Sequence, residues 1–275
     1  MEALASPVND TSDRPPEFVE ALAKGLAVLE AFDMSHPEMT LSEIARRVNA
    51  SPAAVRRSLI TLEALGYVGH SGKRFHLQPK VMGLGSAFYF SARLDELMLP
   101  ELRYLVETFG DAASVATLDE HDVIYIAHQS RQRARRASAV VGARYPAHAT
   151  SMGRVLLAGL EDDALEDYFA TVETQGLTAL TVTSVDTLRE IVTEVRRNGY
   201  ATAVDQLDYG ITALAVPVRT SDGKTVAALN SSGYTGLITP EKMVAERLHE
   251  LRLAANRIAE SVMRYPVLTS ILTGR

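Results

Sequence analysis

The sequence predicts an α+β protein with two domains: a small helical domain that ends in a hairpin, and a larger domain built on an antiparallel sheet. Two observations carry this prediction. The chain has 275 residues, more than the roughly 100–200 residues of a usual single domain. Apolar residues recur at helical spacing in the first part of the chain, whereas hairpin patterns interspersed with helices dominate the second.

Composition narrows the class of protein. A hydrophobic content of 47% and a charged content of 23% are typical of a globular chain. The absence of cysteine excludes a disulfide scaffold, a thiolate metal site and a cysteine nucleophile. There is no apolar run of the ~18 residues needed to span a bilayer, and the N-terminus is acidic and polar. We therefore expect a soluble, cytoplasmic protein with no membrane partner and no cofactor.

The first 16 residues predict a flexible tail, because they are rich in proline and carboxylates and lack apolar periodicity. A first helix is expected from Glu17, in the stretch EFVEALAKGLAVLEAF. The apolar residues at helical spacing that predict it are Phe18, Leu22, Leu26 and Leu29. Residues 17–78 are expected to form the first domain.

A helix, a tight turn and a second helix follow. In TLSEIARRVNA, either Thr40 or Ser42 is suited to cap the start of a short helix. Asn49 is suited to end it, Ser51 to cap the next helix, and Pro52 to occupy that helix's first position, where its missing N–H costs nothing. These signals predict a helix-turn-helix.

The helix that begins at Pro52 has two distinct faces. Its predicted core stripe consists of Val55, Leu59, Leu62 and Leu65. Its outer side holds Ala53, Arg57 and Ala64, with Arg56 at the flank. Ile60 also points outward, so we expect it to touch a neighbouring element.

A hairpin is expected directly after this helix. Gly66 is suited to end the helix, and YVGHSGKRFHL predicts two short strands around a Ser-Gly turn, with Lys73 and Arg74 at that turn. A helix-turn-helix followed by a basic hairpin has the layout of a winged helix.

Positive charge is concentrated in this region. Residues 46–80 hold seven Lys and Arg against one carboxylate, a local charge of +6 in a chain whose net charge is −6. Such a patch can neutralise DNA phosphates, although a solvated helix face is the alternative interpretation. The candidate DNA-contacting residues are Thr40, Ser51, Ala53, Arg56, Arg57, Lys73 and Arg74.

Residues 79–94, PKVMGLGSAFYFSARL, predict a linker helix that is apolar almost all round. A helix of this kind must be buried on every side. We expect a second copy of the chain to cover it in a dimer, and burial within the same chain remains the alternative.

The domain expected over residues 95–275 alternates helices with hairpins. Pro100 is expected to mark a helix start or kink, and Gly110 to end that helix. ASVATLD and VIYIAHQ predict one hairpin, and Asp222-Gly223 is the turn signal of another. Three further helices are expected, in TSMGRVLLAGL, in DTLREIVTEVRRNGY and in the long segment capped by Thr239.

Several motifs in this order resemble the IclR family of bacterial transcription regulators: LAKGLAVLEAF, LSEIARRV, ALGYV, PAHATSMGRVLLAGL, VRRNGYATAVDQLDYGITALAVPVR and AALNSSG. The resemblance covers about residues 17–265 and is strongest to the branch that controls catabolism of protocatechuate, p-hydroxybenzoate and related aromatic acids. It implies a double-stranded DNA operator as partner and a C-terminal effector domain of GAF-like fold. It also implies a homodimer through the linker helix, with a dimer of dimers as a further assembly.

The resemblance also implies an effector pocket. Its expected residues are Ser151, Met152, Asp205, Ala213, Asn230 and Ser232. The chain departs from the family at Gln206 and Leu207, where many relatives carry acidic residues.

The residues themselves fit such a pocket. Thr150 as N-cap would leave backbone N–H groups free at a helix start, where a carboxylate is stabilised. Asn230 and Ser232 are two apart on a predicted strand, so both face one side and could bind ring substituents. Simpler roles stay open: Ser151 as part of the cap, Asp205 closing a turn, and Asn230 satisfying buried backbone.

An enzyme is the alternative function, with Ser151 or His148 acting in the C-terminal pocket. The sequence disfavours it, because ATSMG lacks the Gly-x-Ser-x-Gly elbow and the histidines show no metal-ligand spacing. We therefore expect neither catalytic residues nor a metal site. A second basic run has no assigned role and consists of Arg131, Arg133, Arg135, Arg136 and Arg144.

Overall fold

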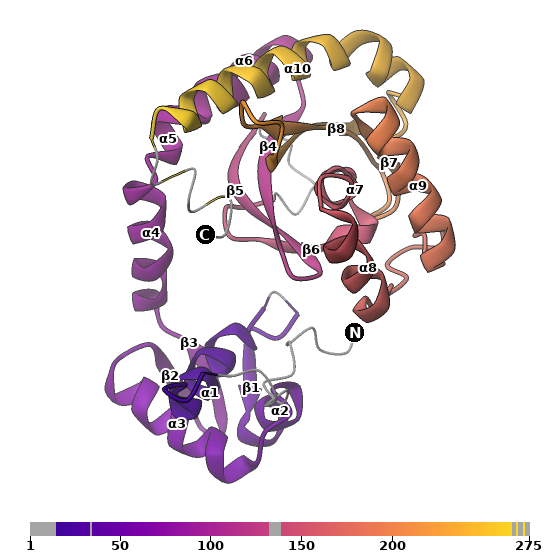
Figure 1. Cartoon of the computed structure of the whole chain (residues 1–275). Coiled ribbons are helices and arrows are strands. Elements are labelled where there is room, and N and C mark those ends of the chain that lie inside the picture. Colours follow the sequence, from indigo (N-terminus) through magenta and orange to yellow (C-terminus); the bar gives the residue numbers. More distant parts are fainter. Residues whose placement is uncertain (1–14, 34, 132–138, 266–267, 269–271, 273–275) are drawn as a thin grey trace. The chain divides into compact units, whose positions relative to one another are not determined.

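The computed structural model describes residues 15–33, 35–131, 139–265, 268 and 272. The chain forms two compact units, one ending at Phe88 and one beginning at Tyr89 (Figure 1). The first 14 residues of the predicted tail lie outside the described residues, as do Arg133, Arg135 and Arg136 of the second basic run.

The N-terminal unit is a helix-turn-helix with a small antiparallel sheet. The strands are arranged in the order β1-β3-β2. The elements are α1 (Glu20–Glu30), β1 (Glu38–Thr40), α2 (Leu41–Arg47), α3 (Pro52–Ala64), β2 (Val68–Ser71) and β3 (Arg74–Leu77).

Local signals set the ends of these helices as predicted. Thr40 and Glu43 form a reciprocal capping box at the start of α2. Asn49 adopts a left-handed conformation, with φ of 48°, and allows the sharp turn. The Ser51 hydroxyl accepts a hydrogen bond from the Ala54 N–H at the start of α3, with Pro52 in the first turn.

The predicted core stripe of α3 is correct in part, and the helix predicted from the apolar spacing near the start of the chain is present as α1. Val55, Leu59 and Leu62 are buried, but Leu65 is 52% exposed, because it lies at the C-cap, where the chain turns away at Gly66. In α1 the buried residues are the small Ala27 and Val28, and Ala31 follows directly. Of the apolar residues at helical spacing, Leu29 packs against this core, whereas Phe18, Leu22 and Leu26 are all at least 40% accessible.

The segment predicted as a linker is helical. It contains η1 (Pro79–Val81) and α4 (Met82–Ser91), and the boundary between the two units falls within α4. No side chain of α4 is buried, and Met82 and Phe90 are 77% and 68% exposed. The described residues therefore leave this apolar helix unburied.

The C-terminal unit is a six-stranded antiparallel sheet with helices on both faces, as the hairpin patterns predict. The strand order is β6-β5-β4-β9-β8-β7. The helices are α5 (Leu94–Leu97), α6 (Leu99–Phe109), η2 (Ala147–Ala149), α7 (Ser151–Ala158), α8 (Asp162–Thr171), α9 (Val185–Asn198) and α10 (Pro240–Met263). The strands are β4 (Ala112–Asp119), β5 (Asp122–Ser130), β6 (Arg144–Pro146), β7 (Ala201–Val204), β8 (Ile211–Arg219) and β9 (Thr225–Tyr234).

The alternation of side chains along the strands separates two cores, and different helices cover the two faces of the sheet (Figure 1). On one face, α5, α6 and α10 pack on large residues such as Val115, Leu214 and Leu229. On the other face, α7, α8 and α9 cover residues that are mostly small, such as Ala215 and Ala228. None of the described helices has both the length and the apolar character that a membrane span requires.

Gly153 allows α7 to approach η2 very closely. A Cβ atom at this position would lie 2.1 Å from the carbonyl oxygen of Ala147, well inside van der Waals contact. Because the obstructing atom belongs to the backbone, a side-chain rotation cannot relieve the clash. Gly153 thus fixes where the start of α7 lies.

We expect Gly153→Ala to lower the free energy of unfolding of the C-terminal unit by about 1–3 kcal/mol, the usual cost of forcing a methyl group into a packed core. Urea unfolding followed by circular dichroism measures the change. Gly176→Ala is the control, because a Cβ there would lie 3.6 Å from its nearest neighbour, an ordinary contact. Equal stability of the two variants would contradict the role given to Gly153.

Candidate functional site

A cavity of about 590 Å³ lies on the α7 face of the sheet. Its floor consists of strand residues whose side chains share one face. Ser130, Ala112, Ser232, Ala213 and Ala203 form a continuous row across β5, β4, β9, β8 and β7, since each is paired in register with the next. All five line the cavity, and their small side chains leave the space open.

A second row on the same face is polar. Ser114 on β4 is paired in register with His128 on β5 and with Asn230 on β9, and all three residues line the cavity. The predicted residues Ala213, Asn230 and Ser232 are therefore brought together as expected. Ser114 and His128 were not among the predicted pocket residues. A period of two along the hairpin puts each on one face of its strand, but only the pairing of β4 with β9 brings that face to Asn230.

The start of α7 forms another part of the wall. Thr150 is the N-cap, and its hydroxyl accepts a hydrogen bond from Gly153 N–H at 2.9 Å. The N–H groups of Ser151 and Met152 therefore have no partner inside the helix. The Ser151 side chain is 2% exposed, and within the described part of the chain its Oγ has no hydrogen-bond partner.

Two predicted pocket residues do not line the cavity in this structure. The Met152 side chain is fully buried in the apolar cluster beneath α7, so only its backbone N–H is available at the helix start. Asp205, at φ of 52°, closes the turn before β8. Its carboxylate accepts hydrogen bonds from Gly210 N–H at 2.7 Å and Ile211 N–H at 3.2 Å. The turn-closing role left open for Asp205 is the one the structure shows.

Arg154 is a buried cation near the cavity. Its guanidinium donates to the carbonyl oxygens of His148 and Thr202 and to Oε1 of Gln206, which itself lines the cavity. None of these partners is a carboxylate. Burial lowers the pKa of Arg154 to about 10, so the group stays charged at neutral pH.

Aromatic side chains and further polar groups complete the walls. Tyr125 and Tyr145 pack edge to face at 5.2 Å between ring centroids, and both line the cavity. Burial raises the pKa of both hydroxyl groups, so they are protonated at neutral pH. Burial also lowers the pKa of His128, which favours its neutral form. The described residues hold no cluster of three or more potential metal ligands.

Some cations of the N-terminal unit are paired with acidic side chains, which the charge count of the sequence did not show. Arg47 is hydrogen-bonded to Asp33 and His36. Arg74 pairs with Glu38 at 2.8 Å and lies 3.7 Å from Glu43. These acidic partners precede residue 46, so a count over residues 46–80 overstates the local positive charge.

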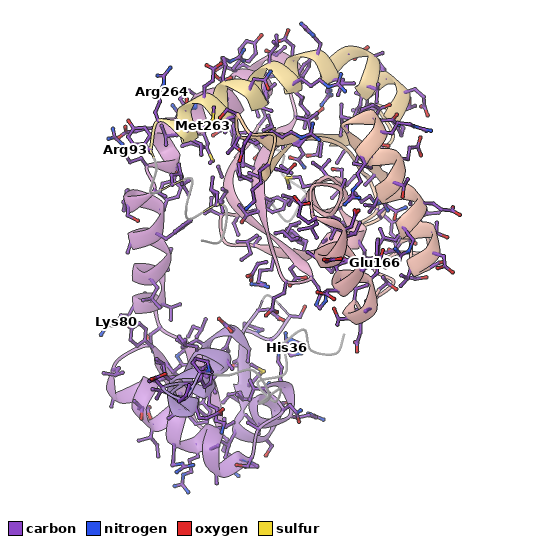
Figure 2. The ribbon with its side chains drawn as sticks, in the orientation of Figure 1. His36, Lys80, Arg93, Glu166, Met263 and Arg264 are labelled. Atoms are coloured by element: carbon purple, nitrogen blue, oxygen red, sulfur yellow. The ribbon has the colours of Figure 1, made fainter. Side chains whose placement is uncertain are left out.

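Four cations of the region have neither an ion pair nor a side-chain hydrogen bond within the part of the chain that the structure describes: Arg46, Arg56, Arg57 and Lys73, all of them exposed. Gly72 and Lys73 form the turn of the β2–β3 hairpin, and Gly72 has φ of 59°. Lys80, labelled in Figure 2, instead donates to the carbonyl oxygen of Leu65 at the end of α3, at 2.7 Å. Ile60 is 57% exposed, so the contact expected for it is absent from the described chain.

Comparison with known proteins gives matches over both units. The family described as "IclR helix-turn-helix domain" matches residues 21–72. The family described as "Bacterial transcriptional regulator IclR C-terminal" matches residues 89–260. The Pca regulon regulatory protein of Pseudomonas putida is 35% identical over 88% of this chain and 83% of its own length. The p-hydroxybenzoate hydroxylase transcriptional activator of Acinetobacter baylyi is 33% identical over 94% of this chain and 97% of its own.

A solved structure matches the C-terminal unit. It is a double mutant of the PobR inducer binding domain from Acinetobacter in complex with 3-hydroxy benzoic acid. It is 32% identical to this chain, with a TM-score of 0.55, over 58% of this chain and 94% of its own.

Asp205 should matter for the stability of the cavity wall. We expect Asp205→Ala to lower the free energy of unfolding by about 1–3 kcal/mol, since it leaves two backbone donors without their acceptor, and to speed hydrogen exchange at Gly210 and Ile211. Asp205→Asn should lose less, because its Oδ1 still accepts and asparagine tolerates positive φ. Equal losses from the two variants would show that the turn does not depend on this acceptor.

Proposed function

The chain belongs to the IclR family of bacterial transcriptional regulators, and from this premise we propose that it controls genes of aromatic-acid degradation in the cytoplasm. In this proposal its affinity for operator DNA is set by an aromatic acid bound in the C-terminal cavity. The cavity carries the proposal: it combines a free helix start and a buried cation with a polar row and aromatic walls.

The acid group of the effector is assigned to the start of α7. Backbone N–H groups at a helix N-terminus stabilise a carboxylate, and Ser151 Oγ is a buried group that lacks a partner in the described chain. Arg154, one turn further along α7, adds a positive charge that is not compensated by a carboxylate among its hydrogen-bond partners. Both features favour an anion over a neutral ligand.

The ring is assigned to the space above the small residues of the floor. A volume of about 590 Å³ falls within the range of about 300–1,000 Å³ that is usual for small-molecule sites. Tyr125 and Tyr145 offer aromatic edges and faces to a benzene ring. The names of the relatives also support this assignment, since they refer to hydroxybenzoates or to the Pca regulon.

Operator DNA is assigned to α3 and the hairpin. Ser51, Ala53, Arg56 and Arg57 lie exposed on α3 or at its start, and Lys73 lies at the hairpin turn. This is the layout in which a recognition helix enters the major groove while flanking groups contact phosphates. Thr40 is left out of the proposed contacts, because its hydroxyl is bonded to Glu43. Arg74 is expected to contribute less, since Glu38 already pairs with it.

A homodimer is the proposed assembly, with a dimer of dimers as its extension. The apolar side chains of α4 that are exposed in the single chain include Met82, Leu84 and Phe90. Burial against a second copy would remove this surface from water, which favours association.

The relatives are named as regulators and activators, which supports a regulator rather than an enzyme. The arrangement of Ser151 also argues against the enzyme alternative. Ser151 Oγ has no hydrogen-bond partner among the described residues, so no base is paired with it. His148 Nε2 is instead bonded to the carbonyl oxygen of Gln175, at 3.0 Å. A regulator releases its ligand unchanged, whereas an enzyme converts it.

We expect Arg57→Ala to weaken binding to the operator in the protein's own promoter about 5- to 150-fold, the range for loss of one good base contact, with a smaller effect on random DNA. Lys73→Ala should weaken binding to both DNAs alike and reduce the salt slope by about 1. Fluorescence anisotropy at several salt concentrations measures both, with Lys224→Ala as a charge-matched control in the other unit. Equal losses of Arg57→Ala on both DNAs would limit Arg57 to phosphate contact.

We expect Ser151→Leu to reduce affinity for the aromatic acid at least about tenfold while leaving DNA affinity without the acid unchanged. The leucine would remove a polar group and fill the space at the start of α7. Calorimetric titration with 4-hydroxybenzoate measures the loss, and Ser221→Leu, in the exposed β8–β9 turn, is the control. A response retained by Ser151→Leu would contradict the placement of the carboxylate.

A further inference from the structure

Ser114, His128 and Asn230 form a polar row across three neighbouring strands. Ser114 on β4 pairs in register with both of the others, so the three side chains lie on one face of the sheet. Neighbouring strands are about 4.8 Å apart, which keeps the members of the row close together. All three residues line the cavity.

The row contains polar atoms that the protein itself leaves unsatisfied. Ser114 Oγ lies 2.9 Å from His128 Nδ1. The other ring nitrogen, His128 Nε2, and the amide oxygen Asn230 Oδ1 are both buried and have no hydrogen-bond partner among the described residues. Asn230 as a whole is only 5% exposed. Buried polar atoms of this kind require a partner, and in a cavity that partner can come from a ligand.

None of the described residues is hydrogen-bonded to these two atoms, including Ser130 and Ser232, whose hydroxyl groups lie in the neighbouring row. Asn230 is flanked on β8 by Ala215, and the neighbouring row continues through Ala112 and Ala213, which have no polar side-chain atoms. A ligand hydroxyl group that lies between His128 Nε2 and Asn230 Oδ1 would satisfy both atoms. The Ser114 hydroxyl donates to His128 Nδ1, His128 Nε2–H donates to the ligand oxygen, and the ligand O–H donates to Asn230 Oδ1.

Charge separates this row from the start of α7. Burial favours the neutral form of His128, and neither Ser114 nor Asn230 carries a charge. A neutral row suits an uncharged group that both donates and accepts, whereas the carboxylate is better placed near Arg154 and the helix start. The carboxylate of a hydroxylated aromatic acid thus suits the start of α7, and its ring hydroxyl group suits the neutral polar row.

We infer that His128, oriented by Ser114 and acting with Asn230, is the subsite that recognises a hydroxyl group on the effector ring. The domain then selects hydroxylated aromatic acids over the unsubstituted acid. This inference rests on the proposed function and adds to it the feature of the ligand that is recognised and the residues that recognise it.

The test compares dissociation constants of benzoate, 3-hydroxybenzoate, 4-hydroxybenzoate and 3,4-dihydroxybenzoate for the full-length protein by isothermal titration calorimetry. A site built to bond a hydroxyl group discriminates strongly against the analogue that lacks it. The wild-type protein should therefore bind at least one hydroxylated acid about tenfold or more tighter than benzoate.

Three variants probe the row: His128→Leu, Asn230→Leu and the smaller change Ser114→Ala. In the two leucine variants, the dissociation constants of the hydroxylated acid and of benzoate should lie within about twofold of each other. The affinity for benzoate itself should change less than about threefold. Ser114→Ala should lose part of the preference, which keeps the test decisive if a leucine variant does not fold. His249→Leu is the matched control, because His249 is exposed on α10, on the opposite face of the sheet.

The outcomes separate the inference from the proposed function. If the wild-type protein prefers a hydroxylated acid and correctly folded variants keep that preference, the subsite assignment is wrong and the proposed function stands. Equal affinity of the wild-type protein for benzoate and for all hydroxylated acids also overturns the assignment alone. Failure of every aromatic acid to bind overturns both.

Discussion

The C-terminal unit depends on the difference in side-chain size between the two faces of one antiparallel sheet. Side chains alternate along each strand, so one face of β9 presents Leu229 while the other presents Ala228, Asn230 and Ser232. The face with large residues is filled against α6 and α10, and it provides the rigid core. The face with small residues cannot be filled in the same way, and the cavity is the space that remains.

In the proposed function, the start of α7 makes that space a site for an anion. Gly153 allows the helix to approach η2, and the Thr150 cap leaves the Ser151 and Met152 N–H groups available. Arg154 then joins α7 to Thr202 and Gln206, so one buried cation ties the helix to the segment that lines the cavity. The same residue therefore holds the wall in place and contributes positive charge. A buried charge is costly unless it is paired, and the hydrogen-bond partners of Arg154 are carbonyl and amide oxygens. An acidic effector would provide the opposite charge.

Much of this arrangement follows from local signals in the sequence. Caps and turn residues such as Ser51, Thr150 and Gly199 fixed helix ends, and the period of two placed Asn230 and Ser232 on one face. Local patterns are insufficient where tertiary context decides. The buried face of α1 consists of small residues around Ala27 instead of its larger leucines, and Met152 points into a core although it lies at the helix start.

The other omissions have a similar origin. Asp205 closes a turn through backbone N–H groups five and six residues away, and the sequence left that role as one of two alternatives. His128 and Ser114 join the site only because β5, β4 and β9 are neighbours in a particular register. Strand order and pairing between hairpins distant in sequence cannot be read from local patterns. The pairing of Arg74 with Glu38 likewise depends on β1 lying beside β3.

The most direct test of the account is the coupling between the two binding events. Affinity for promoter DNA is measured at increasing concentrations of 4-hydroxybenzoate or 3,4-dihydroxybenzoate, and the acid is then recovered and identified by chromatography. The account predicts that at least one acid changes DNA affinity by about 5- to 150-fold, the usual range of allosteric coupling, and is recovered unchanged. DNA affinity that stays constant at saturating acid, or conversion of the acid into a product, would contradict it.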